Sequence, residues 1–552
     1  MKKIKKIRFI SIIFIGYFIL GLFLYKDYGV GIEEHFQRQN GFFWLKNIAE
    51  KFELRFLADA ASSIFFAIRS YDPSLPNPEF FNFYGIIFDV PLALVEIILQ
   101  DKEIKFFFEL RHLINFFIFF ISSIYFFKIL KKRFNSDIII FWGVTFYVCS
   151  PRIFGDSFHN NKDVLFLAFL TISFYYLFNL FEKNKLKDLI LFSIFAAIAT
   201  STRIMGIYLP LLYFIFLFFE FINQNINLKF FLKKIFFVLF FYILFLYLHY
   251  PYMWDLRLDN IFNWFSKFFY NMNLRILFNG EYFHIKYLPR LYLPVWIFIT
   301  TPVYILILSF VGFYLLAKRA YRRILSIQFK KKNHFNDLWR SNNEKKDFFI
   351  FISLTVFLLY AISFDVAMLS GWRHFYFLNL YIVYIAIYCL NIIFLFVKKN
   401  EIKKNSFIFV NFILVLNIIT QIYNFHPYQS LYFNELLVKK NILKFPVDTP
   451  SLSRKDALKF IIADAINLDK INIANASWTP LYNGKDLLLE KNYKKLNFVG
   501  QDYDKADYIY TNFVYEINPN FNNKYFINEN FKTIKEHKIK DITIYKIYKK
   551  LN

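Results

Sequence analysis

Three carboxylates lie within eight residues, directly after the first apolar segment of the chain: Asp27, Glu33 and Glu34. Ionisable groups at a membrane are costly and tend to mark functional sites. A carboxylate within hydrogen-bond reach of a reacting hydroxyl can act as its general base. We therefore interpret residues 27–40 as the chemical centre. The alternative for Glu33 and Glu34 is a solvated start of a helix.

Loops that we assign to the same side of the membrane carry further acids and cations. The relevant residues are Arg152, Lys162, Asp163, Arg203, Arg373 and His374. Cations at the mouths of spans could hold an anionic lipid headgroup. Structural alternatives remain: a helix N-cap for Asp163, a snorkelling cation for Arg203, and interfacial anchors for Arg373 and His374.

Acids and cations together suit the transfer of a sugar from a lipid phosphate. The leaving phosphate would be stabilised by Arg or Lys through electrostatics and hydrogen bonds. The acceptor hydroxyl would lose its proton to a carboxylate as it attacks. Such a donor requires no nucleotide, and the sequence contains no convincing phosphate loop or G-x-G-x-x-G pattern.

The composition identifies the elements that must position these residues. The chain has 552 residues, of which 57% are hydrophobic, and its mean hydropathy is +0.36. Many apolar runs are long enough to cross a ~30 Å hydrocarbon core as helices. We therefore predict an all-α polytopic membrane protein. The net charge of +26 resides mainly in short loops between these runs, which is typical of cytoplasmic loops and argues against nucleic-acid binding.

We predict about eleven transmembrane helices. Their ranges are 9–25, 109–129, 138–151, 164–181, 188–202, 205–222, 233–249, 293–316, 348–367, 375–397 and 405–424. The first is expected to be an uncleaved helix that starts in the cytoplasm, because no small-residue cleavage site follows it. Between the first two spans we expect a long outer segment with interfacial helices, near 41–56 and 58–68. Residues 81–99 are predicted to be interfacial or re-entrant, because every strongly basic short loop then falls on one side.

The tail, residues 425–552, is polar enough for a small α/β domain outside the cytoplasm, following the transmembrane domain of residues 1–424. Within it we expect a helix at 451–466 with a serine cap and its charged residues outside. Strands are expected at 471–477, 506–517 and 542–550.

Other residues receive structural interpretations. Cys149 and Cys389 lie inside apolar spans and exclude a disulfide framework. The histidines of the outer loops match no standard spacing of metal ligands, so we assign no metal site, while the use of a divalent cation stays open. The basic loop 317–347 is expected to determine topology and to contact anionic lipids.

Six segments resemble the GT-C superfamily of polyprenyl-phosphate-sugar glycosyltransferases. They are EEHFQRQ (33–39), SPRIFGDSFHNNKDVLFLAF (150–169), TSTRIMGIYLP (200–210), PRLYLPVWIFITTP (289–302), GWRHFYF (371–377) and HPYQSLYFNELL (426–437). The chain is most similar to bacterial relatives of protein O-mannosyltransferases and lipid A aminoarabinose transferase, grouped as glycosyltransferase family 39. The resemblance covers residues 8–437 and implies a GT-C fold.

The resemblance also implies roles for individual residues. Glu33 occupies the position of the catalytic base, but the family's pair is usually Asp-Glu, which leaves Glu34 as its competitor. Asp163 matches an acid of the second outer loop, which is expected to orient the acceptor or a basic partner. Arg203 matches a basic residue near the lipid phosphate. Further contacts to the headgroup are expected from Lys162, Arg152, Arg373 and His374.

We therefore predict a glycosyltransferase of the inner membrane, with a polyprenyl-phosphate-linked hexose or pentose as donor. Transfer to a hydroxyl of a glycan, lipid or protein would occur on the outer face and invert the anomeric carbon. One alternative is a transporter or lipid flippase with a polar outer vestibule, although its polar groups would be expected in broken spans near the midplane. Another is a non-catalytic scaffold that binds partners through its tail.

Overall fold

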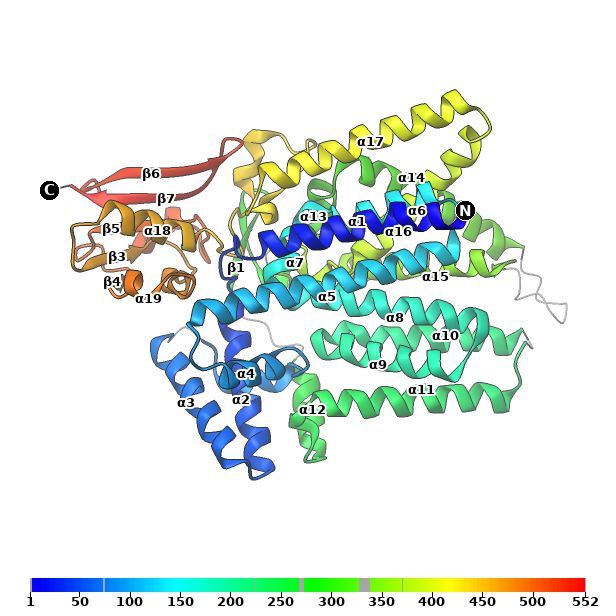
Figure 1. Ribbon diagram of the computed structural model, residues 1–552, viewed down its shortest axis with the longest axis horizontal. Coiled ribbons are helices and arrows are strands. Elements are labelled where there is room, and N and C mark those ends of the chain that lie inside the picture. Colours follow the sequence, from blue (N-terminus) through cyan, green and yellow to red (C-terminus); the bar gives the residue numbers. More distant parts are fainter. Residues whose placement is uncertain are drawn as a thin grey trace.

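The computed structural model describes residues 2–72, 75–223, 225–267, 273–326, 338–369 and 371–551. Residues 327–337 of the predicted basic loop 317–347 lie outside the described residues. The long helices run side by side along the longest axis of the molecule, and a β-sheet lies beyond one end of them (Figure 1). The N-terminus lies at the opposite end of these helices.

Each of the eleven predicted spans coincides with a helix or with a pair of helices. The helices are α1 (Lys2–Leu24), α5 (Ile104–Arg133), α6 (Asp137–Val148), α7 (Pro151–His159), α8 (Asp163–Lys183), α9 (Leu186–Thr202), α10 (Tyr208–Ile222), α11 (Leu228–His249), α13 (Tyr292–Thr300), α14 (Val303–Leu325), α15 (Asn342–Ser363), α16 (Leu378–Val397) and α17 (Glu401–Asn424). In the described part of the chain, eight helices are long and apolar enough to cross a membrane. The polytopic helical fold is thus confirmed.

The remaining three predicted spans do not coincide with one of these eight helices. The apolar part of α1 is Ile10–Leu24, and α9 has 17 residues. The predicted span at 138–151 corresponds to α6 and ends where α7 begins, and the axis bends by 57° between these two helices. Pro151 is the first residue of α7, where its missing N–H costs the new helix no hydrogen bond. The bend keeps the polar residues of α7 at the end of the bundle.

Helix α16 lies at the centre of the bundle and is buried from Leu378 to Leu390. It packs closely against α14, where Gly312 permits the approach. A Cβ atom at Gly312 would lie 2.4 Å from the carbonyl oxygen of Ile385. Close packing of this kind contributes dispersion energy that lipid contacts alone cannot supply.

The long outer segment forms three helices beside the sheet end of the bundle: α2 (Glu34–Lys51), α3 (Arg55–Tyr71) and α4 (Asp89–Ile98). Helix α4 contains 10 residues, which corresponds to about 15 Å and falls short of a ~30 Å hydrocarbon core. Its acids pair with arginines of neighbouring helices, Asp89 with Arg111 and Glu96 with Arg38. The segment 81–99 therefore packs beside the bundle, as expected for a piece that does not cross.

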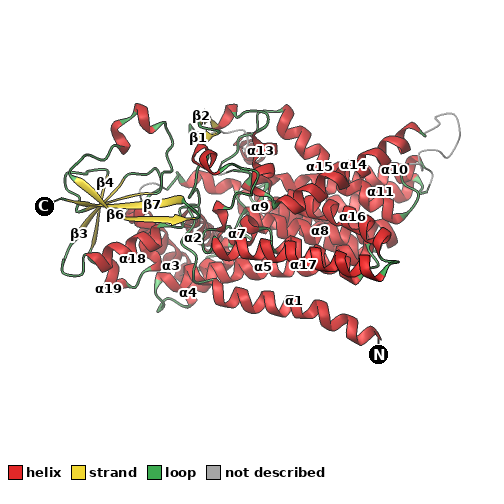
Figure 2. Cartoon of the chain, turned by 90° about the horizontal axis from the view of Figure 1, so that it is seen from above, coloured by secondary structure: helices red, strands yellow, loops and turns green. Residues whose placement is uncertain are grey.

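The tail contains a five-stranded mixed sheet (Figure 2). Its strands, in spatial order, are β4 (Leu496–Gly500), β3 (Ile471–Asn475), β5 (Tyr508–Thr511), β7 (Ile542–Lys550) and β6 (Phe531–Ile539). Strand β3 is parallel to β4 and β5, whereas β7 is antiparallel to β5 and β6. The predicted strands match β3, β5 and β7. Strands β4 and β6 were not predicted. Strand β4 has only 5 residues, and most residues of β6 are polar, so neither shows a clear apolar pattern.

Helix α18 (Arg454–Asp464) lies where a helix was expected, and Ser453 occupies its N-cap position. Ser453 makes no side-chain cap bond, and its hydroxyl contacts Asp448 instead. Arg454 and Lys455 were expected to lie outside, yet both are buried. They point toward the outer segment at the end of α1.

Candidate functional site

Glu33 lies directly before α2, at the sheet end of the bundle, and contacts cations from two other loops. Arg373 forms an ion pair with its carboxylate, and Nζ of Lys162 lies 3.7 Å from Oε2. The Lys162 ammonium also lies 3.5 Å from the centre of the Tyr84 ring. Residues far apart in sequence therefore meet here, as the loop assignment predicted.

Asp163, the first residue of α8, forms a second acidic position behind Glu33. It is 1% exposed and forms an ion pair with Arg203. Nε of Arg373 lies 3.9 Å from its Oδ2, to which the amide of Asn160 donates a hydrogen bond of 3.1 Å. Arg373 thus lies between the two carboxylates. Asp163 is not an N-cap, since the preceding residue has that position.

The charges of this site favour an ionised Glu33. Burial raises the pKa of its carboxyl and is the largest single influence, but the neighbouring charges, led by Arg373, Lys162 and Arg203, jointly outweigh it. The pKa of Glu33 therefore lies well below its usual range. In His374, burial is also the largest influence and, helped by the nearby charge of Arg203, lowers the pKa to about 3. The histidine is consequently neutral at physiological pH.

Glu34 differs from its neighbour in both contacts and exposure. It is 2% exposed. Its Oε1 accepts hydrogen bonds from His112, at 3.1 Å, and from the backbone N–H of Gly31, at 2.6 Å. These bonds hold the turn that precedes α2. The carboxylate of Glu33, by contrast, is 30% exposed.

Arg152 is anchored to the protein by contacts of its own. Its Nε donates to the carbonyl of Tyr432 at 2.9 Å. Its guanidinium lies 5.1 Å from the ring centre of Trp296 and 4.9 Å from that of Phe433. The predicted cation therefore lies near the site, but it packs between aromatic rings.

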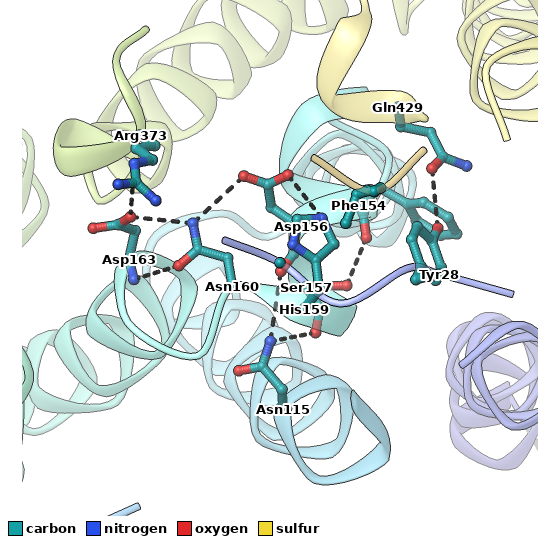
Figure 3. Close-up of polar contacts among 12 residues, drawn as sticks. Tyr28, Asn115, Phe154, Asp156, Ser157, His159, Asn160, Asp163, Arg373 and Gln429 are labelled. Atoms are coloured by element: carbon teal, nitrogen blue, oxygen red, sulfur yellow. Dashed lines mark hydrogen bonds and ion pairs between the residues drawn. The ribbon is translucent and has the colours of Figure 1, made fainter. Parts of the chain in front are cut away.

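Helix α7 supplies further polar side chains next to the predicted site residues. Figure 3 shows Arg373, Asp163, Asn160, Asp156 and His159 in one row of polar contacts. The contacts of this row range from 3.1 Å, between Asn160 and Asp163, to 3.9 Å, between Arg373 and Asp163. The row connects Asp163 to Asp156 and His159, two buried residues of α7.

Glu33, Lys162 and Arg373 line a cavity of 1140 Å³ at the sheet end of the bundle. The tail forms the facing wall, with Asn475, Ser477, Trp478, Tyr482, Asn483, Lys485, Phe498 and Gln501. Asp163, Arg203 and His374 are not among the lining residues. Sequence reasoning missed the whole facing wall, because its side chains carry no pattern that distinguishes them from an ordinary domain surface.

No group of three or more His, Cys, Asp or Glu side chains in the described ranges is arranged to hold a metal ion. The described cysteines, Cys149 and Cys389, are free.

Comparison with known proteins supports the resemblance. Residues 110–251 match the family model of dolichyl-phosphate-mannose-protein mannosyltransferases. This range includes Arg152, Lys162, Asp163 and Arg203. The match confirms the similarity to GT-C glycosyltransferases that the motifs predicted. No curated protein compared with the chain matches it.

Two solved structures have similar helical arrangements. The archaeal oligosaccharyltransferase AglB from Archaeoglobus fulgidus, in complex with an inhibitory peptide and a dolichol-phosphate, is 11% identical with a TM-score of 0.39, and the match covers 78% of this chain and 61% of that one. ArnT from Cupriavidus metallidurans, bound to undecaprenyl phosphate, is 10% identical with a TM-score of 0.35, and the match covers 76% of each chain.

Proposed function

We propose that this protein is an inverting glycosyltransferase that moves a sugar from a polyprenyl-phosphate donor to an acceptor hydroxyl on the outer face of the cytoplasmic membrane. The family model matched by residues 110–251 describes enzymes that take mannose from a dolichyl phosphate. The observation that carries the proposal is the position of the Glu33 carboxylate, which lines a large cavity and pairs there with Arg373 and Lys162.

Glu33 is the general base in this proposal. The acceptor oxygen attacks the anomeric carbon, its proton passes to the Glu33 carboxylate, and the bond between that carbon and the phosphate oxygen breaks. The phosphate leaves with the bonding electron pair. A single displacement of this kind inverts the anomeric carbon. We assign this role to Glu33 in preference to Glu34, because Glu34 is buried and its Oε1 is bonded to His112 and Gly31.

The cations have two partners in this scheme. Without donor, Arg373 and Lys162 neutralise Glu33. The phosphate of a bound donor would compete for both cations, since guanidinium and ammonium groups bind phosphate oxygens well. When the phosphate draws these two cations away from Glu33, the pKa of Glu33 would rise and the carboxylate would become a stronger base. Asp163 would keep Arg203 and Arg373 oriented during this exchange.

The test is transfer of radiolabelled sugar in membranes that contain the Glu33→Gln variant. We expect transfer to fall by at least about a thousandfold, because glutamine cannot accept the proton, while insertion and thermal stability are retained. Glu50→Gln serves as the control, because Glu50 is an exposed carboxylate near the other end of α2. Full activity of Glu33→Gln would refute the assignment.

A further inference from the structure

We infer that the 1140 Å³ cavity binds a carbohydrate as the acceptor, and that Trp478, Asn475 and Asn483 of the tail recognise it. This inference rests on the proposed function and assigns its acceptor class. It gives the tail a direct part in substrate binding.

The first argument is the way in which the tail is joined to the cavity. Two side chains of the loop that contains η9 (Leu481–Leu487) contact three residues of the outer segment. Asp486 lies 2.8 Å from His35 and accepts a hydrogen bond from Tyr71 at 3.3 Å, and Tyr482 donates one to Asp72. These contacts hold the tail at the cavity that contains Glu33.

The second argument is a pair of amide oxygens without donors. Oδ1 of Asn475 and Oδ1 of Asn483 are buried, and no described residue donates a hydrogen bond to either atom. The amide nitrogen of Asn475 is committed to the carbonyls of Ser477 and Thr479, at 3.1 and 2.8 Å, which fixes the orientation of the group. Buried polar atoms of this kind cost free energy unless a partner binds. Both residues line the cavity, where a ligand rich in hydroxyl groups could supply the donors.

The third argument is the exposure of Trp478. Trp478 is 38% exposed, although its neighbours Ser477 and Thr479 are buried. Its backbone N–H is bound to Val514 at 2.9 Å, which fixes the main chain. An indole held at a cavity wall offers a flat apolar surface for the C–H face of a sugar ring, while amides nearby bind the hydroxyls at its rim.

The same wall is less suited to a peptide. A peptide would be expected to pair with the free edge of β4, which is the edge strand at the cavity. Ile473 and Asn475 of the neighbouring strand β3 line the cavity together with Phe498, which pairs with Ile473 in the sheet. Residues two apart point to the same face of a strand, and so do paired residues of neighbouring strands. The cavity therefore meets a side-chain face of β4, and its hydrogen-bonding edge is directed elsewhere.

Photo-crosslinking in the cell membrane tests the chemical class of the acceptor. The photoreactive p-benzoylphenylalanine replaces Trp478 in the full chain, which also carries Glu33→Gln so that bound acceptor is not consumed. Phe521, which is 88% exposed in the same domain, is replaced in the control. We expect a periodate-sensitive adduct with hexose or pentose mass increments at Trp478 only. A peptide adduct, a fatty-acyl adduct, or no adduct would overturn the inference.

Complementation separates this inference from the proposed function. In cells that lack the protein, Trp478→Ala and Asn483→Ala should each lower the glycan product at least about tenfold, a loss expected for removed contacts in a polar site. Binding of undecaprenyl phosphate to the purified variants should remain unchanged, and Phe521→Ala should behave as wild type. Normal product from both variants, with Glu33→Gln inactive, would overturn only the acceptor assignment. Normal product from Glu33→Gln would overturn the proposed function.

Discussion

Arg373 is the side chain on which the electrostatics of the site depend most directly. It forms an ion pair with Glu33 and lies 3.9 Å from Asp163. A buried charge is tolerated only when it is paired and hydrogen-bonded. The two acids therefore hold Arg373 at the cavity, and Arg373 in turn keeps Glu33 ionised. Neither carboxylate could be replaced without altering the other's environment.

The pH dependence of Lys162→Met should reveal this coupling. The charge of Lys162 helps to lower the pKa of Glu33, so its removal should raise that pKa. Glu33 is ionised above its pKa, and activity that needs the ionised form is lost as the pH falls through it. We therefore expect the acid limb of kcat/KM to move to higher pH. The variant Lys459→Met, at an exposed position of α18, should leave the limb in place. An unchanged profile in Lys162→Met would contradict the coupling.

His374 is expected to act as a neutral hydrogen-bonding group. Burial lowers its pKa to about 3, so the imidazole is predominantly uncharged at pH values well above 3. The variant His374→Gln should therefore keep the wild-type pH dependence between pH 5 and 8. We would measure kcat/KM for both proteins across this range. A titration near the ordinary histidine value of about 6.5 that disappears in His374→Gln would show that the charged form is used.

Helix α18 connects the tail to the turn that positions Glu33. Arg454 is 1% exposed, and its guanidinium donates to the carbonyls of Val30, Pro480 and Ser451 at 2.7 to 2.8 Å. Nζ of Lys455 donates to the carbonyl of Lys26 at 2.6 Å. The carbonyls of Lys26 and Val30 belong to the segment after α1, where no helical N–H remains to bind them. The tail therefore stabilises the backbone just before Glu33.

The variant Arg454→Met should loosen this connection. It would leave three buried carbonyls without their donor, at a cost of roughly 3 kcal/mol or more. We expect faster hydrogen exchange in residues 26–34, measured by mass spectrometry on the purified protein. A lower rate of transfer should accompany it. Lys459→Met on the same helix is again the matched control. Exchange at the wild-type rate in Arg454→Met would show that the tail does not hold this segment.

The molecule has two chemically different ends. At the end away from the sheet, Asp347 of α15 forms ion pairs with Arg133 of α5 and Arg319 of α14, at 2.7 and 3.1 Å. Glu182 of α8 lies 2.6 Å from Lys132 of the α5 end. The C-terminal parts of α5, α8 and α14 therefore meet the start of α15 at this end. The polar cavity lies at the opposite end, beside the tail.

This arrangement predicts the sidedness of the protein. Basic loops face the cytoplasm, so the cavity and the tail should face outward. We would place single cysteines by Arg322→Cys and Lys459→Cys, both at exposed positions, in a background with Cys149→Ala and Cys389→Ala. A membrane-impermeant maleimide should label Lys459→Cys in intact cells and Arg322→Cys only after lysis. The reverse labelling pattern would contradict the predicted orientation.

Much of the architecture could be predicted because membrane insertion imposes strong local rules. Apolar length predicted the helices, and the clustering of Lys and Arg grouped the loops. Residues 81–99 illustrate how far this reasoning extends. Asp89 and Glu96 indicated that the segment does not face lipid. Their partners, Arg111 and Arg38, come from other helices and could not be read from the local pattern.

The sequence alone determined that acids and cations gather in loops on one side of a bundle of apolar helices, because charge and hydropathy are properties of each segment. Only the tertiary structure distinguished Glu33 from Glu34, since adjacent residues at a helix start point in different directions. Packing alone decides which of them faces a cavity. The facing wall with Trp478 likewise arises only from the docking of the tail. Its residues are separated from Glu33 by more than four hundred positions, a distance across which no sequence periodicity acts.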